Sequence, residues 1–149
     1  MKASVFRGAL IAALVIALAY QAVGAAVFLP RFGSEDPREV VTAYYDAQRW
    51  GFRAIAVRAL SPELQETRRA ADFVRGLHDD ALFCGQLEVP APSDATMYGE
   101  HADEVQMVVE YRSVWTDEVG NPPGKRLYFV YAGRDEGEPW RILGIGTGP

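Results

Sequence analysis

The stretch VQMVVEYRSVWT, residues 105–116, decides the fold that we expect for this chain. Its apolar and polar side chains alternate with a period of two, which is the pattern of a β-strand with one buried face. One face carries Val105, Met107, Val109, Tyr111, Ser113 and Trp115, and the other carries Gln106, Glu110, Arg112 and Thr116. We therefore predict a long strand that packs its first face against a core.

Shorter strand patterns lie on both sides of this stretch. They are expected at residues 82–89, 125–132 and 140–147, with a short strand or sheet edge at 96–100. Turn-forming residues occupy 90–94, 120–124 and 134–139. Because neighbouring strands joined by short loops pair antiparallel, we predict an antiparallel meander.

Helix signals fill the first half of the chain. Asp36-Pro37-Arg38-Glu39 has an N-cap, a proline at the first helical position and a glutamate three residues after the cap. The helix is expected to end near Trp50, before Gly51. Residues 52–60 predict a second, short helix, and Ser61-Pro62 opens a third. Helices followed by an antiparallel sheet make an α+β domain in which the helices cover one face of the sheet.

The N-terminal region is of a different kind. Residues 10–29, LIAALVIALAYQAVGAAVFL, contain no charge, and at about 1.5 Å per residue they form a helix of about 30 Å, enough to cross a bilayer. Lys2 and Arg7 precede the run, which favours a cytoplasmic N-terminus and an exported domain. We expect an anchor at residues 1–30, a polar hinge at 31–36 and one domain at 37–149.

Two other interpretations of the N-terminal helix stay open. The small residues Ala22, Gly24 and Ala26 also suit signal peptidase, which would release a secreted domain. The anchor is favoured, because the apolar run continues through Leu29 and exceeds the usual apolar region of a signal peptide. A buried core helix is disfavoured, because the run has no polar stripe.

Composition excludes several classes of function. The chain has 149 residues, 49% of them hydrophobic, and a net charge of −5, which becomes −7 when Lys2 and Arg7 are set aside. This acidity argues against nucleic acid as a partner. Cys84 is the single cysteine, so no intramolecular disulfide forms. The two histidines lack metal-ligand spacing, and we expect neither a metal nor a cofactor.

The exported part resembles the NTF2-like (cystatin-like or SnoaL-like) superfamily, particularly its small exported bacterial members. The resemblance covers residues 36–148 and is carried by PREVVTAYYDAQRWGFRAIAVRALSPEL, residues 37–64, and PWRILGIGTGP, residues 139–149. It implies a curved sheet wrapped around the first helix of the domain, often as a cone with a pocket. The superfamily includes isomerases, dehydratases and hydrolases as well as noncatalytic binding modules, so the fold alone does not select a function.

Candidate acid and base residues are few. His78-Asp79-Asp80 and the pair His101 and Asp103 combine histidine with carboxylates, and Glu110 is a further candidate beside Tyr44. Both histidine clusters lie in expected connections, where polar groups are usually solvated, and Glu110 suits an exposed charged face. We therefore assign none of them a catalytic role.

An aromatic set suits a core or the wall of an apolar pocket. It comprises Tyr44, Tyr111, Trp115, Phe129, Tyr131 and Trp140. Three hypotheses follow. The first is a noncatalytic module on the outer face of the cytoplasmic membrane that binds a small apolar ligand or a protein. The second is a SnoaL-like proton-transfer enzyme for an apolar substrate. The third is a homodimer formed through the sheet.

Overall fold

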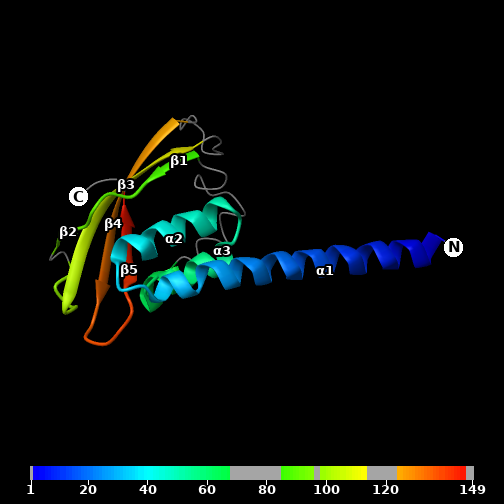
Figure 1. Ribbon diagram of the computed structural model, residues 1–149, viewed down its shortest axis with the longest axis horizontal. Coiled ribbons are helices and arrows are strands. Elements are labelled where there is room, and N and C mark those ends of the chain that lie inside the picture. The colour runs from blue at the N-terminus through cyan, green and yellow to red at the C-terminus, as the bar shows by residue number, and fades with distance from the viewer. Residues whose placement is uncertain (1, 68–84, 96–97, 114–123, 147–149) are drawn as a thin grey trace.

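The structure is a computed structural model, which describes residues 2–67, 85–95, 98–113 and 124–146. Along the described chain, helices come first and an antiparallel sheet follows, with one long helix projecting from the domain (Figure 1). The predicted α+β class and the N-terminal apolar helix are therefore confirmed.

The projecting helix, α1 (Lys2–Phe28), is the apolar element that the sequence predicts. Together with the short helix η1 (Pro30–Gly33) it provides an apolar stretch from Phe6 to Gly33 that is long enough to cross a membrane, and only 6% of its most apolar window is buried. A core helix would be mostly covered by protein. This helix is therefore of the kind that serves as a membrane anchor or as a signal sequence.

The first helix of the domain is α2 (Pro37–Arg49), and it begins and ends where the sequence signals predict. The Asp36 carboxylate accepts a hydrogen bond from the backbone amide of Arg38 at 2.9 Å, which caps the first turn. Gly51, with φ of +77°, takes the left-handed conformation that ends the helix. Short turns of helix follow as α3 (Arg53–Ala56), η2 (Val57–Ala59) and residues 62–67.

The sheet contains β1 (Gly85–Glu88), β2 (Ser93–Asp94), β3 (Asp103–Ser113), β4 (Gly124–Arg134) and β5 (Arg141–Gly146). Its strand order is β1-β3-β4-β5, all pairs are antiparallel, and β2 also pairs with β3. The predicted meander is thus present. One local prediction is wrong: residues 98–100 are not a strand, and the extra strand β2 lies at 93–94, where a turn is expected. Its pairing with Val105 and Gln106 overrides the turn signal.

The core lies between α2 and one face of the sheet. Met107, Val109 and Tyr111 on β3 are each at most 1% exposed, so the predicted alternation holds along the described part of the strand. On α2, Tyr45 packs against Tyr111 with ring centroids 5.6 Å apart. The other buried core residues include Val40, Val41, Ala43, Tyr44, Ala47, Leu60, Val130, Ala132 and Ile142.

The opposite face of the sheet is partly open. Val108 is 40% exposed and its neighbour Leu127 is 47% exposed. Further along, Tyr131 is covered by Tyr98, whose ring meets it edge to face at 6.0 Å. This face therefore presents apolar side chains next to a region that the 98–101 connection covers.

A cluster of aromatic rings joins α1 to the domain. Phe52, 6% exposed, stacks on Tyr20 at 4.4 Å between centroids and tilts against Phe28 at 5.7 Å. Gly24 lies between Tyr20 and Phe28 on the same face of α1. A Cβ at Gly24 would stand 2.3–2.7 Å from atoms of the Phe52 ring, so only glycine admits the ring at this depth.

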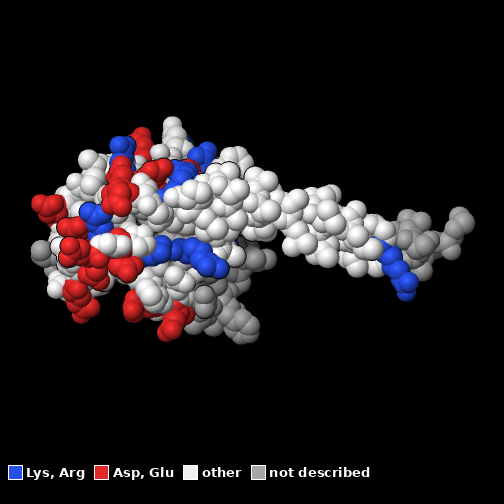
Figure 2. Space-filling model, turned by 60° about the horizontal axis from the view of Figure 1, so that its bottom comes forward, with Lys and Arg blue, Asp and Glu red and all other residues white. Residues whose placement is uncertain are grey.

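Charge is distributed unevenly over the molecule. In the view of Figure 2 the acidic side chains gather on the end of the domain that lies away from the free end of α1. The residues of that end include Glu35, Asp103, Glu104, Asp135, Glu136 and Glu138. The segment nearest α1 is basic, because residues 47–62 contain Arg49, Arg53 and Arg58 and no acid.

We predict that Gly24→Ala loosens the joint between α1 and the domain. The added methyl group must displace the Phe52 ring, and overpacking of this kind costs about 1–3 kcal/mol. Thermal unfolding of the full chain in nanodiscs measures the effect. Gly8→Ala is the matched control, because a Cβ at Gly8 has no atom within 4 Å. Equal unfolding temperatures for the two variants would contradict the role of the joint.

Candidate functional site

A groove of about 600 Å³ lies beside β1, where the N-terminal turn of α2 approaches the sheet. Its apolar lining consists of Leu87, Val89, Pro90, Val108 and Leu127, and its polar lining consists of Arg38, Thr42, Glu88 and Glu110. An apolar floor with a few polar groups at the rim is the usual composition of a binding site.

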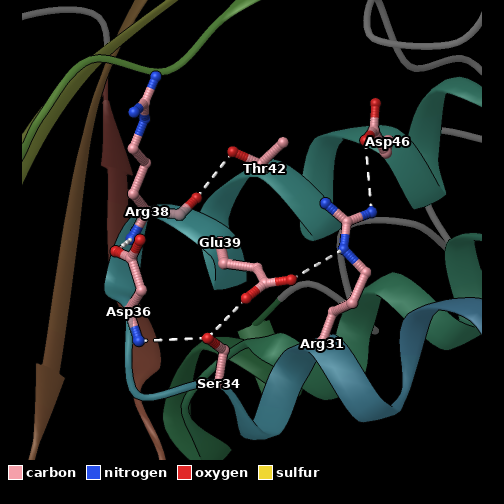
Figure 3. A network of polar contacts seen from close by, with 7 residues as sticks. All are labelled: Arg31, Ser34, Asp36, Arg38, Glu39, Thr42 and Asp46. Atoms are coloured by element: carbon pink, nitrogen blue, oxygen red, sulfur yellow. Dashed lines mark hydrogen bonds and ion pairs between the residues drawn. The ribbon is translucent and has the colours of Figure 1, made fainter.

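A chain of polar contacts positions the α2 side of this groove (Figure 3). The Asp36 backbone amide donates to the Ser34 hydroxyl, and that hydroxyl donates to the Glu39 carboxylate at 2.7 Å. Glu39 in turn lies 3.6 Å from the Arg31 guanidinium. The segment 31–36, which the sequence predicts as a hinge, is thus connected to α2 by several contacts.

Arg38 is the cationic side chain of the groove. Its Nε donates to the Val89 carbonyl oxygen at 2.6 Å, which ties the start of α2 to the segment after β1. One turn later, the Thr42 hydroxyl donates to the Arg38 carbonyl oxygen at 2.7 Å. Arg38 therefore lines the groove, and its hydrogen bond to Val89 holds the two sides of the groove together.

Of the acid and base candidates Glu110, His101 and Asp103, Glu110 lines the groove. Its carboxylate forms an ion pair with the Lys125 ammonium at 2.7 Å, and its side chain is 34% exposed. Tyr44, the predicted acid/base partner of Glu110, is 3% exposed in the core, where its ring meets Tyr45 edge to face. A half-exposed carboxylate paired with lysine suits recognition of polar groups at the rim.

The other two candidates, His101 and Asp103, lie at the acidic end and do not line the groove. His101 contacts Asp135, with 3.2 Å between Nδ1 and Oδ2, and Asp103 instead accepts a hydrogen bond from Arg134 at 2.9 Å. The Asp135 carboxylate also accepts from the Ala102 amide. These contacts connect the loop after β4 to the start of β3, which is a structural arrangement.

Arg134 links three distant parts of the chain at this end. Its guanidinium binds Asp103 and Glu35 and stacks over the Trp140 ring at 4.8 Å. The Trp140 indole donates to the Glu35 carbonyl oxygen at 3.0 Å. The sequence does not predict this cluster, because Glu35 and Arg134 stand far apart in the chain and no local pattern relates them.

Glu104 is held by backbone amides of the 98–101 connection. Desolvation alone would raise the pKa of its carboxyl group, but hydrogen bonds from the backbone amides of Gly99, Tyr98, Glu100 and His101 outweigh it and lower the pKa below its ordinary value. The Tyr98 and Glu100 amides donate at 3.0 and 3.2 Å. The ionised form of Glu104 therefore orders the connection that covers the Tyr131 region of this sheet face.

The predicted aromatic set is divided between the two faces of the sheet. Tyr44 and Tyr111 lie in the core, and Trp140 is buried beside Arg134. Phe129 and Tyr131 pair with Val108 and Gln106 and so point to the opposite face. The described members therefore do not meet in a single wall.

Several other candidates lie outside the described residues: Trp115, Cys84 and the cluster His78-Asp79-Asp80. Among the residues that the structure describes, no three histidine, cysteine or acidic side chains converge as metal ligands. No family model, curated protein or solved structure matches this chain.

We predict that Glu104→Gln destabilises the 98–101 connection at neutral pH. The folded state lowers the pKa of Glu104. The ionised carboxylate therefore contributes fully to the stability of the fold above the unfolded pKa, and this contribution is lost as the pH falls through the folded pKa. The wild type should unfold at a higher temperature than the variant at pH 7, and the difference should shrink as the pH falls through the lowered pKa of folded Glu104 and vanish below that pKa. Glu138→Gln, at an exposed turn, is the control and should match the wild type. A constant difference at all pH values would exclude the ionised carboxylate as its cause.

Proposed function

We propose that this chain is a single-pass protein of the cytoplasmic membrane, with its N-terminus inside and a noncatalytic binding or protein-interaction domain outside. In this proposal the helix formed by residues 10–29 is retained, and the domain at 37–149 has the NTF2-like fold. The groove beside β1 is the binding site.

The observation that carries the proposal is the contact of α1 with the domain core. Phe28 is 5% exposed, and Gly24 lies against the Phe52 ring. Cleavage near Ala26 would remove Tyr20 and Gly24 and would leave Phe52 without its stacking partner. A signal peptide has no need of such a joint, whereas an anchor that supports a domain does.

Charge supports the orientation. Lys2 and Arg7 are the only charged residues before Arg31, which favours retention of this end in the cytoplasm. Arg31 and Arg38 follow the helix, but they belong to a long domain, and long domains cross the membrane largely regardless of their charge. The charges before the helix therefore support the proposal that the domain lies on the outer side.

The groove supports binding as the activity. Its apolar lining is accessible, because Val108 and Leu127 are 40% and 47% exposed. Two of its charged groups already have partners: Arg38 binds the Val89 carbonyl oxygen and Glu110 binds Lys125. Such groups suit orientation of a ligand or of a partner segment.

The enzymatic alternative has less support. Proton transfer requires an acid or base within hydrogen-bond reach of a bound substrate. His101 and Asp103 belong to the acidic end rather than to the groove, and both are engaged in contacts that hold loops together. The NTF2-like assignment rests on the succession of helices and antiparallel strands, with α2 packed on one sheet face.

We predict that a photoreactive phenylalanine analogue at Leu127 captures the occupant of the groove in intact membranes. Leu127 is exposed enough to accept the larger side chain. Illumination of cells should give a specific adduct, resolved by mass spectrometry. An adduct of two copies of this chain would instead establish self-association through the sheet.

The matched control carries the same analogue at Glu136, which is exposed in the turn after β4 and does not line the groove. It should give no adduct of the same mass. Identical products from the two positions, or none from Leu127, would contradict binding at the groove.

A further inference from the structure

The domain reaches far back along α1. The Tyr20 hydroxyl donates to the Trp50 carbonyl oxygen at 2.5 Å, and its ring stacks on Phe52. Tyr20 lies in the middle of the apolar stretch of residues 10–29. The C-terminal half of that stretch therefore runs beside the domain.

This contact limits how much of α1 is left for the bilayer. From Arg7 to Tyr20 the helix rises about 20 Å, at about 1.5 Å per residue. The hydrocarbon core is about 30 Å thick. A short span is accommodated by thinning of the bilayer and by snorkelling of flanking side chains such as Arg7. No length remains for a water layer between the bilayer and the corner where α2 meets α3.

The side chains of this corner suit the headgroup layer. Trp50 is 53% exposed, and the Arg49 guanidinium lies over its ring at 5.8 Å from the centroid. Arg53 and Arg58 follow, and the three arginines outnumber the two flanking acids, Glu63 and Asp46, the second of which lies 4.0 Å from Arg49. Tryptophan and tyrosine are enriched at membrane interfaces, and basic residues near the surface are attracted to anionic lipid.

The opposite end of the domain has the opposite charge, as Figure 2 shows. Glu100, Asp103, Glu104 and Asp135 gather there with Glu136 and Glu138. An anionic surface attracts the basic corner and repels the acidic end. Both effects favour the same orientation, in which the acidic end points away from the membrane.

We propose that the corner formed by residues 49–53, together with Arg58, docks on the phospholipid headgroups of the membrane that α1 spans, with a preference for anionic lipid. The proposal rests on the proposed function, since it requires α1 to be an anchor. It adds that the domain lies on the bilayer surface in a fixed orientation.

Brominated lipids test this docking with the full chain. The protein is reconstituted in nanodiscs of phosphatidylcholine alone or with phosphatidylglycerol, with bromine near the headgroup or deep in the acyl chains. The signal of Trp50 is the difference between the wild type and Trp50→Phe. We expect shallow bromine to reduce this signal at least twofold, deep bromine to reduce it less, and anionic lipid to strengthen the shallow effect.

Substitution of the arginines provides the second arm. Arg49→Gln combined with Arg58→Gln should remove the difference between anionic and neutral discs, whereas Glu136→Gln with Glu138→Gln at the far end should preserve it. A protein that enters the discs but shows no quenching of Trp50 would overturn the docking and leave the anchor intact. Equal quenching in the two lipids would overturn the preference for anionic lipid. Failure of the chain to enter the discs would overturn the anchor itself.

Discussion

The packing of the Phe52 ring against Gly24 is the contact on which the rest of this structure depends. It works because Tyr20, Gly24 and Phe28 follow one another at intervals of four on α1, so that two aromatic rings flank a gap that only glycine leaves open. Without this contact α1 would be an apolar tail joined by a short connection. With it, the helix and the domain have a defined relative position.

Several features follow from that position. The segment that follows α1 is held to the start of α2 by the Ser34 and Glu39 contacts, and there Arg38 holds the wall of the groove through the Val89 carbonyl oxygen. The corner at Trp50 lies beside α1 at one end of the domain, and the acidic cluster around Arg134 lies at the other end. The two ends of the domain along α1, its proposed anchor, therefore carry opposite charge. That arrangement would display the groove at a set height above the lipid.

Local chemistry in the sequence predicted the elements well, and distant contacts explain what it missed. The cap at Asp36, the stop at Gly51 and the alternation along β3 are local signals, and each was confirmed. β2 was missed because its pairing with β3 depends on a partner strand, and the Arg134 cluster was missed because Glu35 enters it from far away in the chain. Gly24 was interpreted as a small residue for signal peptidase. The spacing of Tyr20, Gly24 and Phe28 at intervals of four is the sequence signal that could have predicted the contact between α1 and the domain.

The most direct test of the central claim is the state of the N-terminus in the cell. The chain is isolated from membranes after alkaline carbonate washing, and its intact mass is measured by mass spectrometry. If α1 is a retained anchor packed against Phe52, the chain stays in the membrane pellet and still contains Tyr20 and Gly24. A chain that begins after Ala26 and appears in the soluble fraction would contradict the claim.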